Sequence, residues 1–161
     1  MPMTTINVPT LFEWIGGIEA LEKLFQRFYD RVPADPVLAP VFAQMSPEHF
    51  RTVAHFVAEV LGGPPLYSGD QRHGHSTMIA KHLARHLTNT QRKCWMDLLL
   101  DTADELKLPD DPEFRSALVG YLEWGSRLAV LNSAMEDNPL DDQAPMPRWG
   151  WGEAKGPYQP G

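Results

Sequence analysis

The sequence has little of what a disulfide-stabilised, membrane-bound or nucleic-acid-binding protein needs. Cys94 is its only cysteine, so no disulfide can form within the chain. No apolar run reaches the length of a membrane span, and the first residues lack the basic start and apolar stretch of a secretion signal. Lys and Arg number 14 against 21 Asp and Glu, and the resulting net charge of -7 disfavours nucleic acid and anionic membranes as partners. We therefore expect a cytoplasmic protein with no nucleic-acid or membrane partner.

Signals for β-strands are missing as well. The sequence shows no run in which apolar and polar residues alternate, and no Asn-Gly hairpin turn. Apolar residues instead recur at steps of three and four between Ile18 and Val32, which is the spacing of one face of a helix. Pro33 ends this pattern, and similar patterns follow it. We expect an all-α protein with longer helices over residues 18–32, 46–61, 74–85, 88–106 and 110–133.

Capping residues predict where three of these helices begin. Ser46 fits the N-cap of the second helix, with Pro47 in the first helical position. Thr88 fits the N-cap of the fourth helix, and Gln91 completes a capping box with it. The last helix is expected to open at Asp110-Asp111-Pro112.

The length of 161 residues is that of a single domain. We divide the chain into an N-terminal arm (residues 1–10), a helical domain (11–133) and a C-terminal extension (134–161). Proline and glycine are frequent in the extension, which disfavours regular structure. It also holds three large aromatic residues, Trp149, Trp151 and Tyr158. Their apolar area predicts that the extension docks, either on its own domain or on a neighbouring subunit of a homo-oligomer.

Six histidines in a short helical chain raise the question of a metal or cofactor site. His82 and His86 have the spacing of one helix face. A closed zinc site needs four ligands, however, and the one thiol, Cys94, lies beyond an expected helix break. A histidine taken singly is most often exposed or hydrogen-bonded in a core, which is our interpretation of His55, His73 and His86. Structural zinc is therefore disfavoured.

His82 stands apart because of the residues around it. Haem iron needs a neutral imidazole, an apolar cleft for the macrocycle and a few polar groups on its other side. Trp95 follows His82 by thirteen residues, inside an apolar helical pattern. Apolar side chains flank His82 and are expected to contact haem: Met78, Leu83 and Leu87. Polar side chains are expected to reach the haem propionates: Tyr67, Arg72 and His75.

Several motifs together point to one protein family. The chain carries Gly16-Gly17, Phe28-Tyr29, Asp35-Pro36-x-Leu38-x-Pro40-x-Phe42, Gly62-Gly63-Pro64-x-x-Tyr67, and the spacing of His82 to Trp95. Over about residues 11–133 it resembles the truncated haemoglobins of the second group. The resemblance implies a truncated globin fold, a two-over-two helical sandwich that encloses haem b, and it leaves the C-terminal extension out.

The resemblance also implies roles for individual residues. His82 corresponds to the proximal iron ligand, and Tyr29 and Trp95 correspond to donors that hydrogen-bond the bound gas. Three further positions correspond to residues of the distal pocket, Phe42, His49 and Val53.

The chain departs from the family pattern near the proposed ligand. Arg85 stands where an aromatic residue is often found, and His86 stands where proline or an apolar residue is common. An alignment with His86 as ligand leaves only nine residues to Trp95 and breaks the helix start at Thr88. This favours His82 as the ligand.

The expected function is binding of O2 and of other diatomic gases such as NO and CO. Bound O2 carries partial negative charge, so hydrogen-bond donors stabilise it more than neutral CO and slow its release. Slow release suits O2 or NO chemistry, redox work or sensing better than bulk oxygen transport. Conversion of nitric oxide to nitrate with a reductase partner and peroxidase-like turnover are both compatible with these residues, and the sequence does not separate them.

Two other classes fit the sequence less well. One is a cofactor-free helical interaction module with the aromatic extension as its docking element. The other is a non-haem metal enzyme with histidine and carboxylate ligands. A haem absorption band in the purified protein distinguishes the globin from both.

Overall fold

The computed structural model describes residues 7–69, 74–140 and 144–160. All regular structure in these ranges is helical, which confirms the all-α prediction. None of the helices in the described ranges is both long and apolar enough to span a membrane.

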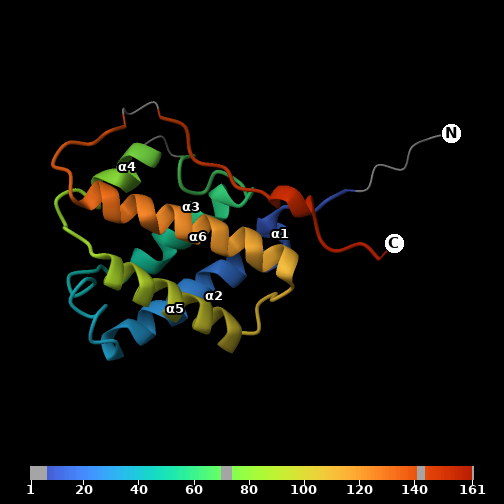
Figure 1. Ribbon diagram of the computed structural model, residues 1–161, viewed down its shortest axis with the longest axis horizontal. Coiled ribbons are helices and arrows are strands. Elements are labelled where there is room, and N and C mark those ends of the chain that lie inside the picture. Colours follow the sequence, from blue (N-terminus) through green and yellow to red (C-terminus); the bar gives the residue numbers. More distant parts are fainter. Residues whose placement is uncertain (1–6, 70–73, 141–143, 161) are drawn as a thin grey trace.

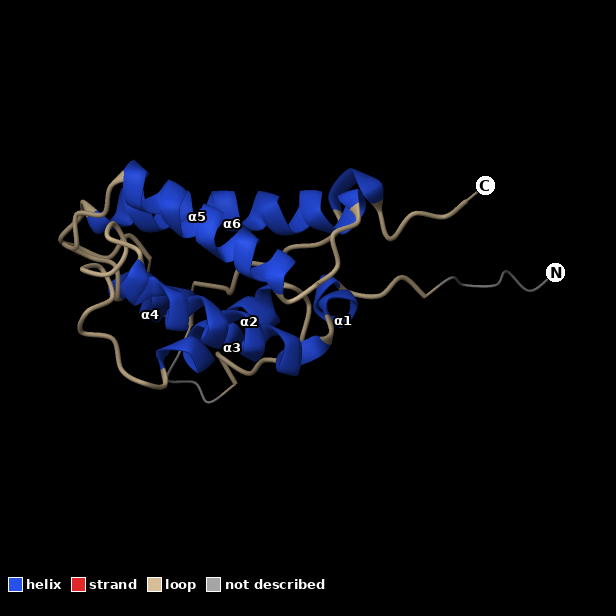
Figure 2. Ribbon diagram, turned by 90° about the horizontal axis from the view of Figure 1, so that it is seen from below, coloured by secondary structure: helices blue, strands red, loops and turns tan. Residues whose placement is uncertain are grey.

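The longer helices form two layers of two, which is the predicted sandwich (Figures 1 and 2). In one layer α2 (Gly17–Arg31) packs on α3 (His49–Val60), and in the other α5 (Asn89–Glu105) packs on α6 (Pro112–Ser133). Shorter elements complete the fold: α1 (Leu11–Ile15), the 3-10 helix η1 (Val32–Ala34), α4 (His75–Ala80) and the 3-10 helix η2 (Gly152–Ala154).

Two of the three predicted helix starts are confirmed. The Thr88 hydroxyl accepts from the Gln91 backbone N–H, and the Gln91 side chain accepts from the Thr88 N–H, which completes the capping box of α5. The Asp111 carboxylate caps α6 by accepting from the Phe114 N–H. Gly16 separates α1 from α2 with a φ of 116°, a conformation that strains any other residue.

The third predicted start, with Ser46 as N-cap, is wrong. α3 begins at His49, two residues after the predicted first helical residue, Pro47. The His49 backbone N–H donates to the Ser46 carbonyl at 3.1 Å. Glu48, with φ −91° and ψ 0°, has not yet entered the helix. Residues 46–48 therefore form a turn that leads into the helix.

α4 is also shorter than the helix expected over residues 74–85, because it ends at Ala80. Ala84 and His86 adopt left-handed φ values of 60° and 52°, which a continuing helix excludes. Their backbone N–H groups donate to the carbonyls of Met135 and Ser133 at the end of α6. The connection from α4 to α5 is therefore not a continuation of α4. It is held in place by hydrogen bonds to the end of α6.

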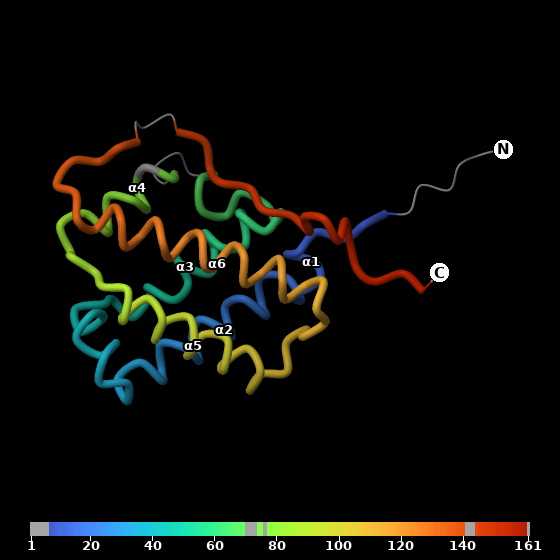
Figure 3. The backbone as a smooth tube through the Cα atoms, viewed as in Figure 1, coloured from blue at the N-terminus to red at the C-terminus, as the bar shows by residue number. Residues whose placement is uncertain are grey.

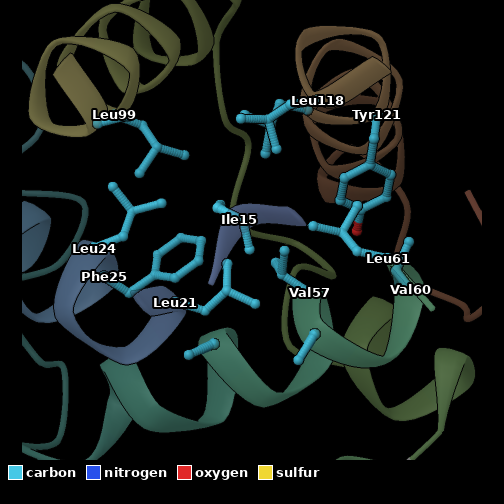
Figure 4. Packing of buried hydrophobic residues seen from close by; sticks show 14 of the residues in the cluster. Ile15, Leu21, Leu24, Phe25, Val57, Val60, Leu61, Leu99, Leu118 and Tyr121 are labelled. Atoms are coloured by element: carbon cyan, nitrogen blue, oxygen red, sulfur yellow. The ribbon is translucent and has the colours of Figure 1, made fainter. Parts of the chain in front are cut away.

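The core fills the space between the layers at one end of the sandwich (Figure 4). There Leu21, Leu24 and Phe25 of α2 lie across from Leu99 of α5 and Leu118 of α6. All five side chains are at most 3 % exposed, so this end is closed to water. Burial of this kind is the main favourable contribution to folding.

The C-terminal extension turns back after α6 and runs beside that helix toward α1 (Figure 3). Trp151 is 9 % exposed and Trp149 is half-buried, whereas Tyr158 is 72 % exposed. The extension therefore docks on the helices of its own chain, through two of its three large aromatic residues.

Candidate functional site

A cavity of about 510 Å³ lies between the two layers, beside the starts of α3 and α5 and the second half of α6. Its volume is typical of cofactor sites, which measure roughly 300–1,000 Å³. Most of the side chains that line it are apolar. The cavity can therefore take a large, mainly apolar ligand.

His82 lines this cavity from the turn that follows α4. Its Nδ1 lies 2.9 Å from the Met78 carbonyl oxygen, which can only accept, so Nδ1 carries the ring proton. Burial lowers the pKa of His82, and the positive charges of Arg85 and Lys81 act in the same direction against the Met78 hydrogen bond. The imidazole is therefore neutral at pH 7, and its Nε2 keeps a lone pair for a metal.

Residues 81–87, which we call the proximal segment, are fixed by the end of α6. The Ala84 N–H donates to the Met135 carbonyl at 2.9 Å, and the Leu87 N–H donates to the Ser133 hydroxyl at 2.8 Å. His86, the rival ligand, is exposed and does not line the cavity. The geometry thus brings His82, and not His86, to the site.

Three aromatic rings meet at another part of the cavity wall. The Tyr29 ring lies edge-on to Phe42, with centroids 5.3 Å apart, and edge-on to His49, with centroids 5.0 Å apart. Tyr29 is only 8 % exposed, and burial raises the pKa of its hydroxyl, so the O–H stays protonated. We call Tyr29, Phe42, His49, Val53 and Trp95 the distal wall, and all five line the cavity.

His49 is neutral at physiological pH. Burial lowers its pKa to about 4, and the positive charges of Lys81 and Arg85 act in the same direction. A neutral imidazole can donate one hydrogen bond and accept one, but it carries no charge.

Two hydrogen-bond donors of the distal wall have no acceptor among the described residues. Within residues 7–69, 74–140 and 144–160, neither the Tyr29 hydroxyl nor the Trp95 indole N–H donates to another group of the chain. Trp95 is held edge-on to Phe28, with centroids 6.0 Å apart. Both donors are therefore available to a ligand in the cavity.

The structure distributes the remaining sequence-predicted residues unevenly. Met78, His75 and Leu87 line the cavity, but Leu83 does not. Tyr67 lies behind the wall, edge-on to Phe56 at 5.1 Å, and Phe56 lines the cavity in its place. Arg72 and His73 lie outside the described residues.

Sequence reasoning missed the basic side chains at the cavity. Lys81, Arg85 and Arg92 all line it. Arg92 lies one helical turn before Trp95, a spacing that places both on one side of α5 and that could have identified it. These three cations are suited to bind the carboxylates of a ligand.

A metal site built from protein ligands alone finds no support in this part of the chain. Among the described residues, no three histidine, cysteine, aspartate or glutamate side chains lie close enough together to hold a metal ion.

Known proteins are similar to this chain in sequence and in fold. The family described as Bacterial-like globin matches residues 10–124. The group 2 truncated hemoglobin YjbI of Bacillus subtilis is 36 % identical over 133 residues, which are 83 % of this chain and 96 % of the relative. The chain belongs to the group II truncated haemoglobins.

Solved structures of truncated haemoglobins have the same architecture. The group II protein from Bacillus anthracis matches with a TM-score of 0.68 and 29 % identity, over 78 % of this chain and 93 % of its own. A truncated oxygen-avid haemoglobin from Bacillus subtilis matches with a TM-score of 0.65 and 35 % identity, over 76 % and 99 %. As a truncated haemoglobin, this chain is a haem-binding globin, and the cavity between its layers is the candidate haem pocket.

Proposed function

We propose that this truncated haemoglobin binds haem b with His82 as the iron ligand, and holds O2, NO or CO beneath Tyr29 and Trp95. The observation that carries the proposal is the hydrogen bond from His82 Nδ1 to the Met78 carbonyl, 2.9 Å long. This bond sets the tautomer in which Nε2 keeps a lone pair for a metal, and His82 lines the same cavity as Tyr29 and Trp95.

The residues around the cavity fit haem. Apolar side chains cover most of its wall, as a macrocycle requires, and Lys81, Arg85 and Arg92 supply positive charge for two propionates. Bound haem supplies the iron that reacts with a diatomic gas. The chain supplies the ligand to that iron, the apolar surroundings and the hydrogen bonds.

Tyr29 and Trp95 favour a ligand that carries partial negative charge. Each well-placed hydrogen bond in a dry pocket contributes about 1–2 kcal/mol, so two bonds slow release by roughly thirty- to a thousandfold. O2 gains more from them than CO because CO stays nearly neutral. The Bacillus subtilis structure described as oxygen-avid supports slow O2 release in this chain as well.

His49 adds a neutral imidazole to the same wall. With a pKa of about 4, it does not act as a charged acid at pH 7. Its ring positions Tyr29, with centroids 5.0 Å apart, and it can bond the ligand as a neutral donor.

We infer that slow release serves chemistry with O2 or NO, redox work or sensing and not bulk oxygen transport. Oxidation of nitric oxide to nitrate with a reductase partner and peroxidase-like turnover are the two candidate activities. The cytoplasmic location and the homo-oligomer remain predictions from the sequence.

An absorption spectrum of the purified protein tests haem binding. We expect an intense Soret band at one haem per chain after haem supplementation, and ferrous complexes with O2 and CO. A protein that takes up no haem would be the helical interaction module. Bound metal without porphyrin would make it a non-haem metal protein.

A further inference from the structure

The C-terminal extension lies outside the globin family match, which ends at residue 124. It is nonetheless attached to both layers of the sandwich. Three of its residues connect it to the cavity or to the helices around it: Pro147, Trp149 and Trp151.

Trp149 joins the end of α3 to α6. Its backbone N–H donates to the carbonyl of Val60, the last residue of α3, at 2.9 Å. A helix leaves its final carbonyls without internal partners, so this bond satisfies a group that would otherwise need water. The indole packs on Tyr121 and Trp124 of α6, with centroids 5.8 and 5.6 Å apart.

Trp151 anchors the extension at the closed end of the sandwich. Its indole N–H donates to the Pro9 carbonyl at 2.7 Å. The ring lies edge-on to Trp14, with centroids 5.8 Å apart, and edge-on to Phe114, with centroids 6.3 Å apart. Trp151 is thus held in place by contacts with the N-terminal arm, with α1 and with the start of α6.

The helices that Trp149 joins carry two walls of the haem pocket. α3 contributes His49 and Val53, and α6 contributes Gly125 and Ala129. Each of these helices packs chiefly on another partner, α3 on α2 and α6 on α5. The spacing of α3 and α6 around the cavity is therefore weakly fixed by their own contacts.

α3 and α6 come together at the closed end of the cavity. Figure 4 shows Tyr121 reaching from α6 toward Leu61 and Val60 at the end of α3. Trp149 binds both sides of this junction, and Pro147, two residues earlier, lines the cavity itself.

We propose that the extension is a clasp that fixes the spacing of α3 and α6 and thereby slows the exchange of haem and of diatomic gases. Trp149 is its positioning residue. The proposal rests on the haem binding proposed above. Because Trp149 does not line the cavity, its loss leaves His82 and the distal donors in place. It changes only how often α3 and α6 move apart.

The test compares full-length, haem-loaded variants. Trp149→Ala removes the ring from Tyr121 and Trp124, and Trp149→Phe restores an aromatic contact. Tyr158→Ala is the matched control, because it removes an aromatic residue of the same extension that is 72 % exposed. Trp151→Phe removes only the hydrogen bond from the indole to the Pro9 carbonyl. This variant replaces Trp149→Ala in the test if Trp149→Ala does not fold.

Two rates are measured well below the melting temperature: haem transfer to an excess of an apoglobin acceptor, and CO association after flash photolysis. For Trp149→Ala we expect transfer about tenfold faster and association severalfold faster, with an unchanged Soret maximum. Trp149→Phe is expected to recover most of both rates, Tyr158→Ala to match the wild type, and Trp151→Phe to raise both rates by a smaller factor.

Wild-type rates in folded Trp149→Ala, or in Trp151→Phe where the alanine variant does not fold, would overturn the clasp. So would a lower melting temperature without a change in either rate, because the extension would then only stabilise the fold. A wild-type protein that takes up no haem would instead overturn the proposed function, so the two failures are distinguishable.

Discussion

The distal wall and the proximal segment hold their functional groups by different means. Tyr29 and Trp95 lie on long helices and are fixed by edge-on contacts with Phe28. His82 lies in a turn after a six-residue helix, and the chain that follows it is fixed by hydrogen bonds to the end of α6. Packing thus positions the proposed gas-binding donors, and backbone hydrogen bonding positions the proposed iron ligand.

Removing the packing behind the distal wall is expected to have the largest effect. Phe28 is fully buried and contacts both Tyr29 and Trp95. For Phe28→Ala we expect the free energy of unfolding to fall by about 3–5 kcal/mol, measured by urea denaturation. O2 release is expected to accelerate as both donors lose their support. Phe50→Ala is the control, because Phe50 is only partly buried and lies outside the cavity wall; an equal loss there would contradict the special role of Phe28.

Weakening the hydrogen bonds of the proximal segment is expected to have the second-largest effect. The buried Ser133 hydroxyl accepts from the Leu87 N–H and donates to the Val130 carbonyl. Ser133→Ala leaves the Leu87 N–H unpaired, which is expected to cost about 1–3 kcal/mol and to speed haem loss. Ser116→Ala makes the same change at an exposed position of α6 and is expected to leave haem retention unchanged. Equal haem retention in the two variants would show that Ser133 does not hold the segment.

A smaller effect is expected from the removal of one hydrogen-bond donor of the distal wall. Trp95→Phe keeps the aromatic contact and removes the N–H, so O2 release is expected to rise about five- to tenfold with little change in stability. Trp14→Phe is the control, since its N–H donates to Asp111 outside the cavity. An unchanged release rate in Trp95→Phe would mean that the indole only packs.

The smallest expected effect is on the pH dependence of stability. His49 titrates near its ordinary pKa of 6.5 when unfolded and at about 4 when folded, so between these values the unfolded chain binds the proton first. The free energy of unfolding therefore falls as the pH drops through this window. His49→Gln is expected to flatten that fall, measured by denaturation at pH 4.5 and 7. The exposed His86→Gln is expected to retain the wild-type slope, and identical slopes in all three proteins would contradict the assignment to His49.

The helical pattern, two capping motifs and the place of His82 at the cavity could be predicted from the sequence, because each depends on residues close together in the chain. The role of His82 as iron ligand stays a prediction. The sequence did not reveal that α4 ends at Ala80. Left-handed backbone at Ala84 and His86 has no marker comparable to glycine, and it depends on carbonyls at the end of α6. The contact of Trp149 with Val60 and α6 was equally invisible, since it joins segments far apart in sequence.

We propose that His82 and not His86 binds the iron. The most direct measurement is haem content and the ferrous resonance Raman spectrum of His82→Ala and His86→Ala, each with and without added imidazole. We expect His82→Ala to lose haem or its iron–histidine stretch, and imidazole to restore the signal, while His86→Ala behaves as the wild type. Normal haem content and an unchanged iron–histidine stretch in His82→Ala would show that His82 does not bind the iron.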